Sequence, residues 1–391
     1  MYHLKLEVDE MKRIGVLLLA LCMVAGLLPP EARAAPAEVS AKSAVLMDAA
    51  TGTILYEQNA HEKLAPASVT KVMTMLLIME AIDAGRIGWD DMVTASEAAA
   101  AKGGSQIYLK VGETMSVTDM LKSIAVSSAN DCACAMAEHI AGSEDAFVQR
   151  MNERAAELGM NDTHFVNCTG LDDEENAAEH LTSAHDIAIM SRQLLVNHPD
   201  IKKFTTIWMD TVRNGTFGLS NTNKLVRFYS GATGLKTGFT AKAGYCLSAS
   251  ASRDGMELIA VVMGSATSKD RFNACKQLLD YGFANYALVS PEVRQDRVSV
   301  NLGTADTVDA VPTRDPQLLI DKAQKNSVTS AVELERGVTA PVSKGQRLGT
   351  LTVRSGEQVL AQIPMVAAEA VPKLTWGQMF SLVLRQLAMA R

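Results

Sequence analysis

Apolar and polar residues alternate in short runs near the start of the chain and again around residue 250. The runs 43–48 and 53–57 flank the turn 49–52, and the runs 244–252 and 257–264 flank Arg253-Asp254-Gly255, so each pair predicts a β-hairpin. Between the pairs, apolar residues recur at helical spacing. The predicted helices cover 66–85, 117–127, 130–141, 146–158, 183–196 and 268–279. Strands at both ends of a helix-rich middle favour one antiparallel sheet beside a helical lobe.

The pattern changes after residue 286. Four short β-type runs follow, with Gly and Pro between them: 293–302, 307–311, 328–334 and 349–353. They predict a small all-β domain over 287–371, a length that can fold alone. It contains no constellation of catalytic residues, so we assign the chemistry to a preceding domain over 35–286.

The last segment, 372–391, predicts an amphipathic helix. Its apolar residues recur at helical spacing and form one stripe: Trp376, Met379, Phe380, Val383, Leu384 and Leu387. Lys373, Arg385 and Arg391 add positive charge. Such a helix is typical of a peripheral anchor that lies in the membrane interface. The alternative is a helix that packs on its own domain or on a partner protein.

The N-terminus, 1–34, predicts an export signal. Lys12 and Arg13 precede an apolar stretch, 14–28, and Ala32-Arg33-Ala34 has the small-x-small form of a cleavage site. Acidic Asp9 and Glu10 do not fit a signal peptide, which indicates that translation starts at Met11. We expect a mature chain that begins at Ala35 and acts at the outer face of the cytoplasmic membrane.

Composition and charge exclude some functions. The chain has 391 residues, 48% of them hydrophobic, and a formal net charge of −7 with no basic stripe, so no nucleic-acid partner is expected. The acidic run 172–175 lacks the spacing of a calcium loop and predicts a solvated loop. An odd number of cysteines follows the signal peptide, which predicts buried thiols. They are Cys132, Cys134, Cys168, Cys246 and Cys275.

Three short patterns together predict an active site: Ser68-Val69-Thr70-Lys71, Ser128-Ala129-Asn130 and Lys236-Thr237-Gly238. Each is common alone, and Ser68 with Lys71 could be a helix start and a surface lysine. In this order they form the S-x-x-K, S-x-N, K-T-G set of the penicillin-interacting serine acyltransferases. One helical turn separates Ser68 from Lys71, so a neutral lysine amine can take the serine proton. Burial and a second ammonium, Lys236, would lower the pKa of Lys71.

The chain resembles the serine-type D-alanyl-D-alanine carboxypeptidases, the low-molecular-mass penicillin-binding proteins. Besides the three patterns, the resemblance rests on 66–71, 104–109, 161–171, 180–186, 221–225 and 233–240. It implies an α+β fold, the penicillin-binding/β-lactamase-like transpeptidase fold, followed by the β-rich domain and the terminal helix. It also implies that the enzyme removes the terminal D-alanine from peptidoglycan stem peptides ending in D-Ala-D-Ala, and that β-lactams bind covalently.

The resemblance implies a role for each residue of the set. Ser68 would form the acyl-enzyme, Lys71 would accept its proton, and Ser128 would pass a proton to the leaving amine. The implied substrate-binding residues are Asn130, Lys236, Thr237, Gly238 and Phe239, with the backbone N–H groups of Ser68 and Phe239 as the oxyanion hole. Arg253 would either add charge for the substrate carboxylate or make a structural ion pair. No cofactor and no metal are predicted.

Three other functions remain open at this point. A β-lactamase would need an activating glutamate, and Glu174, Glu175 and Glu179 do not stand in an E-x-x-L-N setting. A transpeptidase shares the acylation step, and a wall-binding protein without activity could keep the fold. No G-x-S-x-G or H-E-x-x-H pattern accompanies His139, His180 or His185, so we expect ordinary core or hydrogen-bonded histidines.

Overall fold

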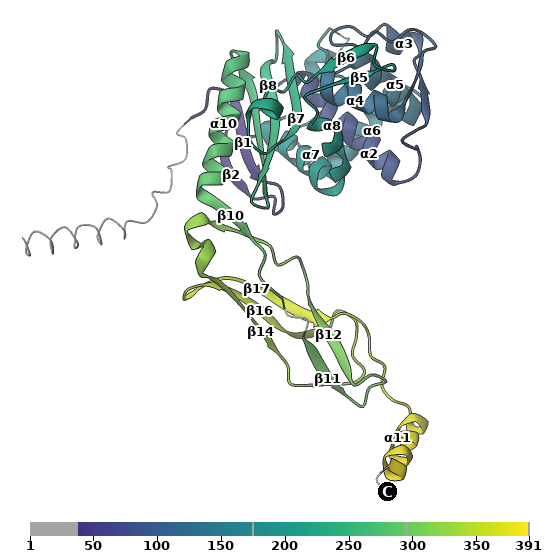
Figure 1. The fold of residues 1–391 in the computed structure, drawn as a ribbon, viewed down its shortest axis with the longest axis vertical. Helices are drawn as coiled ribbons and strands as arrows, with labels where there is room; N and C mark the ends of the chain where they lie inside the picture. The colour runs from purple at the N-terminus through teal and green to yellow at the C-terminus, as the bar shows by residue number, and fades with distance from the viewer. Residues whose placement is uncertain (1–37, 174–175, 294–295, 390–391) are drawn as a thin grey trace, which may run out of the picture.

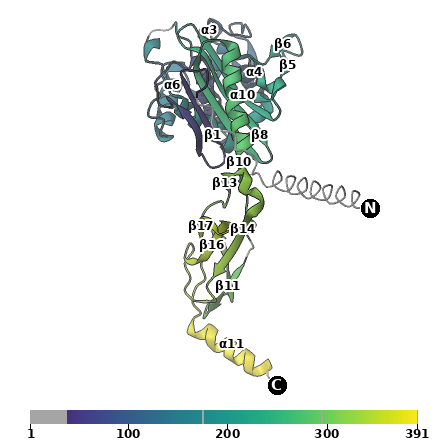
Figure 2. The same ribbon diagram turned by 90° about the vertical axis from the view of Figure 1, so that its left-hand side faces the viewer.

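The computed structural model of the protein describes residues 38–173, 176–293 and 296–389. An α+β region, residues 38–285, stands at one end of an elongated molecule, and a β-rich region, residues 286–375, extends away from it (Figures 1 and 2). The C-terminal helix lies at the far end. The predicted signal peptide, 1–34, lies outside the described residues.

The α+β region contains a five-stranded antiparallel sheet with the order β2-β1-β9-β8-β7. Its strands are β1 (Ser43–Asp48), β2 (Ile54–Gln58), β7 (Ala232–Thr240), β8 (Gly244–Arg253) and β9 (Met256–Ser265). Strand β1 pairs with β9, and Val45 lies opposite Val261. This confirms the predicted sheet in which the two ends of the segment meet.

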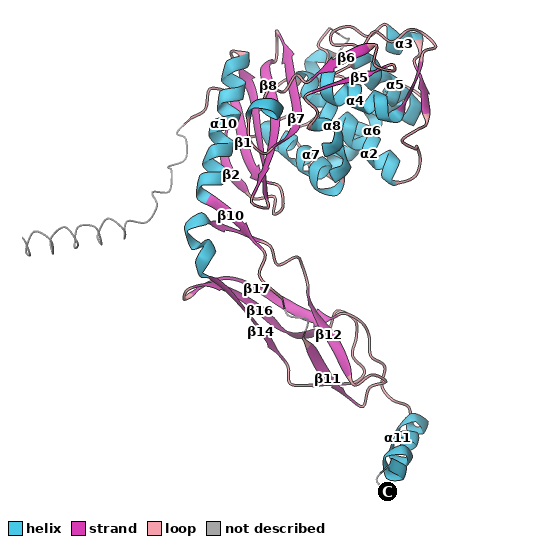
Figure 3. Cartoon of the chain, in the orientation of Figure 1, coloured by secondary structure: helices cyan, strands magenta, loops and turns pink. Residues whose placement is uncertain are grey.

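The sheet is the middle layer of three. Val45 and Met47 of β1 pack into the core of the helical lobe, whereas Ala44 and Leu46 pack on the side of α10 (Ser268–Asn285). Figure 3 shows α10 along one side of the sheet and helices α2 to α8 on the opposite side. Successive side chains of a strand point to opposite faces, so a strand covered on both sides is apolar throughout.

The helical lobe contains α2 (Lys71–Asp83), α3 (Glu97–Ala100), α4 (Val117–Ser127), α5 (Asn130–Ala141), α6 (Glu144–Glu157), α7 (Ala184–Asn197) and α8 (Lys202–Thr205). The short α9 (Leu225–Phe228) packs through Leu225 into the core on the side of α10. Helices α4 and α5 have the predicted bounds. Helix α6 begins before the predicted residue 146, because the Ser143 side chain accepts from the Ala146 N–H and caps the helix. Helix α10 continues beyond the predicted residue 279, since Phe283 extends its buried face.

Short elements connect these helices. The 3-10 helices are η1 (Ala67–Thr70), η2 (Ala177–Glu179) and η3 (Pro199–Ile201). Two small hairpins, β3 (Met92–Thr94) with β4 (Thr114–Ser116) and β5 (Met209–Val212) with β6 (Phe217–Ser220), lie at the edge of the lobe. All five predicted cysteines are buried free thiols, as expected.

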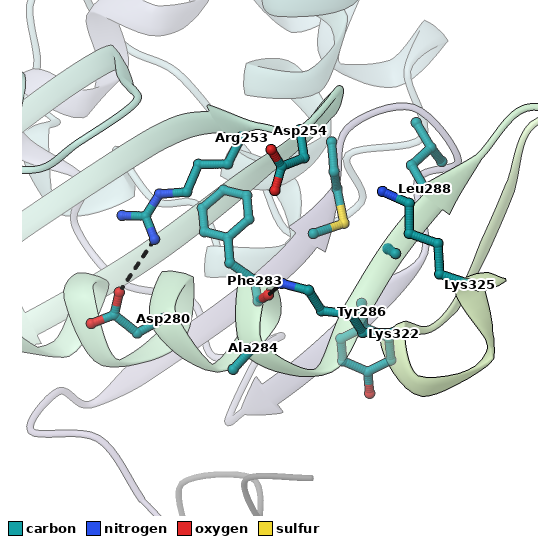
Figure 4. A pocket seen from close by; sticks show the side chains of 11 residues that line it. Arg253, Asp254, Asp280, Phe283, Ala284, Tyr286, Leu288, Lys322 and Lys325 are labelled. Carbon is teal, nitrogen blue, oxygen red and sulfur yellow. Dashed lines mark hydrogen bonds and ion pairs between the residues drawn. The ribbon is translucent and has the colours of Figure 1, made fainter. Parts of the chain in front are cut away.

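The junction of the two regions is formed by β10 (Tyr286–Val289), which continues directly from α10 and pairs with β13 (Leu318–Asp321). Beyond β13, the Lys322 ammonium in η4 (Lys322–Ser327) donates to the Phe283 carbonyl at 2.7 Å. Figure 4 shows this contact at the edge of a cavity of about 430 Å³. Arg253 also lines the cavity, where it pairs with Asp280 at 3.8 Å.

The β-rich region is a six-stranded sheet with the order β14-β16-β17-β12-β11-β15. Its strands are β11 (Arg297–Asn301), β12 (Thr307–Pro312), β14 (Val328–Leu334), β15 (Val338–Thr339), β16 (Arg347–Ser355) and β17 (Gln358–Ala367). The four predicted runs all contain strands. Strand β17 was not predicted, because Pro364 and two Gln residues interrupt its apolar pattern. It pairs with β16 and with β12 and so completes the sheet.

The C-terminal helix, α11 (Trp376–Met389), has the predicted position. Three of its apolar side chains are largely exposed: Trp376 is 86% exposed, Phe380 67% and Val383 54%. Among the helices of residues 38–173, 176–293 and 296–389, none combines the length and the apolar character needed to cross a bilayer.

Candidate active site

The nucleophile segment lies where η1 meets α2. Ala67, just before Ser68, has a left-handed backbone with φ of 48°. The Lys71 ammonium nitrogen lies 3.0 Å from Ser68 Oγ and donates to the Thr169 carbonyl at 2.7 Å. Lys71 thus faces Ser68 across one helical turn, as the spacing predicts.

Lys71 is completely enclosed in protein. Burial disfavours the charged ammonium and lowers the pKa of Lys71 to about 7, although the charge of Asp131 opposes the shift. A substantial fraction of the amine is therefore neutral near neutral pH. A neutral amine at hydrogen-bond distance from a serine hydroxyl can accept its proton.

Ser128 and Asn130 lie between α4 and α5, where Ser128 ends α4 in a left-handed conformation with φ of 63°. The Asn130 amide donates to the Gly103 carbonyl at 2.7 Å. Ser128 Oγ and Asn130 Oδ1 are both buried, and neither has a hydrogen-bond partner among the residues that the structure describes. Buried polar atoms are almost always paired, so these two oxygens mark a place for substrate groups.

The residue after Asn130 holds the loop that forms this side of the site. Asp131, fully buried at the start of α5, accepts from the N–H groups of Ile107 and Leu109. The Asn130 N–H itself donates to the Ser105 carbonyl at 2.7 Å. The segment 104–109, part of the family resemblance, is thereby fixed against the second motif.

Strand β7, at the edge of the sheet, carries Lys236 and Thr237. Lys236 is buried, and its ammonium donates to the Thr237 carbonyl at 3.0 Å. Burial holds the pKa of Lys236 well below its usual range, and the nearby charge of Lys71 lowers it further. Thr237 donates to the Thr222 hydroxyl at 2.6 Å. The site thus contains two lysines whose charges oppose each other.

Gly238 lets β7 approach the nucleophile. A β-carbon at this position would lie 2.6 Å from the Pro66 carbonyl oxygen and 3.1 Å from the Ser68 nitrogen. Phe239 follows, 53% exposed, and its ring stacks on Tyr245 with 4.3 Å between centroids. The backbone next to Gly238 therefore lies beside the backbone of Ser68, where an oxyanion hole is expected.

Several of the predicted residues lie close together. Ser68 contacts Lys71 and adjoins Gly238, the charge of Lys71 acts on Lys236, and Asn130 precedes Asp131, whose charge acts on Lys71. Arg253 lies elsewhere. Its guanidinium lies over the rings of Tyr229 and Phe283 and pairs with Asp280, which is the structural alternative. Figure 4 shows Phe283 and Asp280 beside it. Glu174 and Glu175 lie outside the described residues, and Glu179 is exposed in η2. His180 is hydrogen-bonded and buried, as expected for a core histidine.

Two contributors to the site were not predicted. The buried Arg271 of α10 donates to the Gly238 carbonyl at 2.9 Å and so supports the K-T-G strand from below. Thr169 holds Lys71 through its carbonyl, 98 residues along the chain. Neither contact could be predicted from the local sequence. Arg271 is one of several charged residues in a predicted helix, and Thr169 acts through its backbone carbonyl, which every residue has.

The comparisons with known proteins agree with this geometry. A family model described as D-alanyl-D-alanine carboxypeptidase matches residues 30–267. The chain is also 43% identical over 367 residues to the D-alanyl-D-alanine carboxypeptidase DacF of Bacillus subtilis, covering 92% of this chain and 93% of that one. The chain belongs to the D-alanyl-D-alanine carboxypeptidase family.

Further matches extend the family relationship beyond the α+β region. Residues 288–373 match the C-terminal domain of penicillin-binding protein 5. A crystal structure of penicillin binding protein 5 from Haemophilus influenzae aligns with a TM-score of 0.74 at 32% identity, over 86% of this carboxypeptidase-family chain and 99% of the other. Penicillin-binding protein D2 of Listeria monocytogenes, in its ampicillin-bound form, aligns with a TM-score of 0.56 at 31% identity, over 63% of this chain and 99% of that one. These relatives confirm the predicted α+β fold and the β-rich domain after it.

Proposed function

We propose that the protein is a serine carboxypeptidase that removes the terminal D-alanine from peptidoglycan stem peptides ending in D-Ala-D-Ala. One observation supports this above all others: the Lys71 nitrogen lies 3.0 Å from Ser68 Oγ, and burial brings the pKa of Lys71 to about 7. A nucleophile and its base are therefore already in contact.

The acylation step follows from the geometry. Neutral Lys71 takes the Ser68 proton while Oγ attacks the carbonyl of the penultimate D-alanine. The carbonyl oxygen becomes an oxyanion, which the N–H groups of Ser68 and Phe239 stabilise. The protonated Lys71 returns its proton through Ser128 to the departing D-alanine nitrogen, the C–N bond breaks, and Lys71 is neutral again. An ester on Ser68 remains, and water then hydrolyses it with Lys71 again as the base.

Substrate recognition uses the remaining groups. The terminal carboxylate binds Lys236 and Thr237, which restores the charge of Lys236 and keeps Lys71 the neutral member of the pair. Asn130 Oδ1, buried and unpaired among the described residues, accepts from the amide N–H of the substrate. A β-lactam presents a carbonyl and a carboxylate in the same way, so it acylates Ser68 and stays bound.

A single assay separates this function from its rivals. The purified mature chain is incubated with a pentapeptide ending in D-Ala-D-Ala, and free D-alanine is measured together with penicillin hydrolysis and transfer to an acceptor amine. We expect D-alanine release, slow penicillin hydrolysis and little transfer. Rapid penicillin turnover without D-alanine release would establish a β-lactamase, dominant transfer a transpeptidase, and no reaction a binding protein.

We further propose that the exported protein is held at the outer face of the cytoplasmic membrane by α11. The exposed Trp376, Phe380 and Val383 supply apolar area, and Lys373 adds attraction to anionic lipid. Truncation after Pro372 should move the protein to the soluble fraction and leave its soluble carboxypeptidase activity unchanged. High salt should release little of the full-length chain, because apolar burial is the main contribution. Equal membrane association of both forms would mean that the helix packs on protein.

A further inference from the structure

A chain of hydrogen bonds leads from His180 to the residue before the nucleophile. The Val166 N–H donates to His180 Nδ1 at 3.1 Å. His180 Nε2 lies 2.8 Å from Thr70 Oγ1, and the Thr70 hydroxyl donates to the Ala67 carbonyl at 2.8 Å. His180 and Thr70 are both buried.

The direction of every proton in this chain is determined. Because His180 Nδ1 accepts from the Val166 backbone, the neutral imidazole carries its proton on Nε2. Thr70 has one hydroxyl proton and gives it to Ala67, so it must accept the proton of His180 Nε2. The order is therefore Val166 to His180, His180 to Thr70 and Thr70 to Ala67, with every donor matched to an acceptor.

The last acceptor in this series of hydrogen bonds, Ala67, has a strained backbone. Ala67 is a non-glycine residue with φ of 48°, an unfavourable conformation that persists only when its surroundings enforce it. Gly170 lies directly against the Ala67 carbonyl and limits where that carbonyl can point. A β-carbon on Gly170 would lie 1.9 Å from the Ala67 carbonyl oxygen. The segment of Gly170 also holds Lys71 through the Thr169 carbonyl.

We propose that His180 is a positioning residue for the nucleophile: through Thr70 it fixes the Ala67 carbonyl, and the left-handed turn at Ala67 then directs Ser68 Oγ toward Lys71. This inference rests on the proposed function. It assigns a role to Thr70, the third residue of S-x-x-K: Thr70 links His180 to the Ala67 carbonyl. Neither His180 nor Thr70 takes part in the proton transfers of acylation.

Two matched pairs of variants test the series of hydrogen bonds from His180 through Thr70 to Ala67. Thr70→Val keeps the shape but removes the hydroxyl, whereas Thr70→Ser keeps the hydroxyl. His180→Gln places an amide nitrogen near the imidazole Nε2 and can still donate to Thr70, whereas His180→Asn ends near Nδ1 and cannot reach it. For each folded variant, the fraction of competent enzyme is titrated with labelled penicillin, and the acylation rate constant, kcat and KM are measured.

We expect Thr70→Val and His180→Asn to acylate roughly 10- to 100-fold more slowly and to lower kcat with little change in KM, because misplacement of a reacting atom costs rate and not binding. The acylation rate constants of Thr70→Ser and His180→Gln should stay within about fivefold of wild type. The Thr70→Val/His180→Asn double variant should acylate no more slowly than the slower single variant, because both substitutions interrupt the same series of hydrogen bonds.

Wild-type acylation by Thr70→Val would overturn the proposal, as would additive losses in the double variant. If a His180 variant does not fold, the Thr70 pair alone gives the answer. The wild-type control keeps the two hypotheses apart. If the wild type neither releases D-alanine nor takes the penicillin label, the proposed function fails. If the wild type reacts and Thr70→Val matches it, only the role of His180 fails.

Discussion

The α+β region and the β-rich region bury different kinds of side chain. The first encloses Lys71, Lys236 and Asp131, together with oxygens of Ser128 and Asn130 that have no partner among the described residues. In the described part of the β-rich region, the buried polar residue is Thr352. Buried charge and unpaired polar atoms cost free energy, so they are concentrated where they serve chemistry.

Some of the backbone strain lies at the site as well. Left-handed non-glycine residues occur in several parts of the α+β region, such as Asn59, Asn214 and Asp254, and two others, Ala67 and Ser128, adjoin or belong to the motifs of the site. In the described β-rich region Leu302 has this conformation. One region therefore carries the free-energy cost of a reactive site, while the other is a β-sheet with an ordinary apolar core.

The largest effect is expected for Lys71→Arg. A guanidinium keeps the positive charge but cannot give up its proton near neutral pH, so acylation should fall by more than about 1,000-fold. Stopped-flow or quench measurements with labelled penicillin test this. Lys71→Gln provides the control without charge, and it should be similarly slow. Near wild-type acylation by the arginine variant would show that Lys71 is structural.

The acylation rate constant should also depend on pH, with a smaller change than the one expected for Lys71→Arg. Because burial lowers the pKa of Lys71 to about 7, the neutral base is lost as pH falls through that value. The acylation rate constant should rise to a plateau above pH 7 and fall roughly tenfold per unit below it. Burial also lowers the pKa of His180 to about 4, so this histidine stays neutral over the range measured. A flat profile between pH 5.5 and 8.5 would contradict the assignment.

A core substitution in the β-rich region should lower the stability of that region and leave the acylation rate constant nearly unchanged. Leu351 is fully buried there, and Leu351→Ala should cost about 2–5 kcal/mol of that region's stability. The acylation rate constant at 25 °C should stay within about twofold of wild type if residues 287–371 form a separate folding unit. Calorimetry and acylation are measured on the same preparation, with Thr329→Ala, an exposed strand position, as the control. A parallel loss of acylation would show that the two regions unfold together.

The sequence predicted elements best where local signals were strong. Helices α4 and α5 have the predicted bounds because Ser116 caps the first and the left-handed Ser128 separates the two. Strand β17 was missed, since its place depends on pairing with β16 and β12 and not on its own pattern. The motifs predicted the contact of Ser68 with Lys71, but the contacts of Lys71 with Thr169 and of Arg271 with Gly238 arise only when distant segments pack together.

The most direct test of the account is to locate the penicillin adduct. The mature chain, labelled with a penicillin and digested, should carry the added mass on the peptide that contains Ser68, and Ser68→Ala should lose both the label and D-alanine release. The neighbouring hydroxyl of Ser128 is the alternative nucleophile in the same site. An adduct on Ser128, or on any residue other than Ser68, would contradict the account.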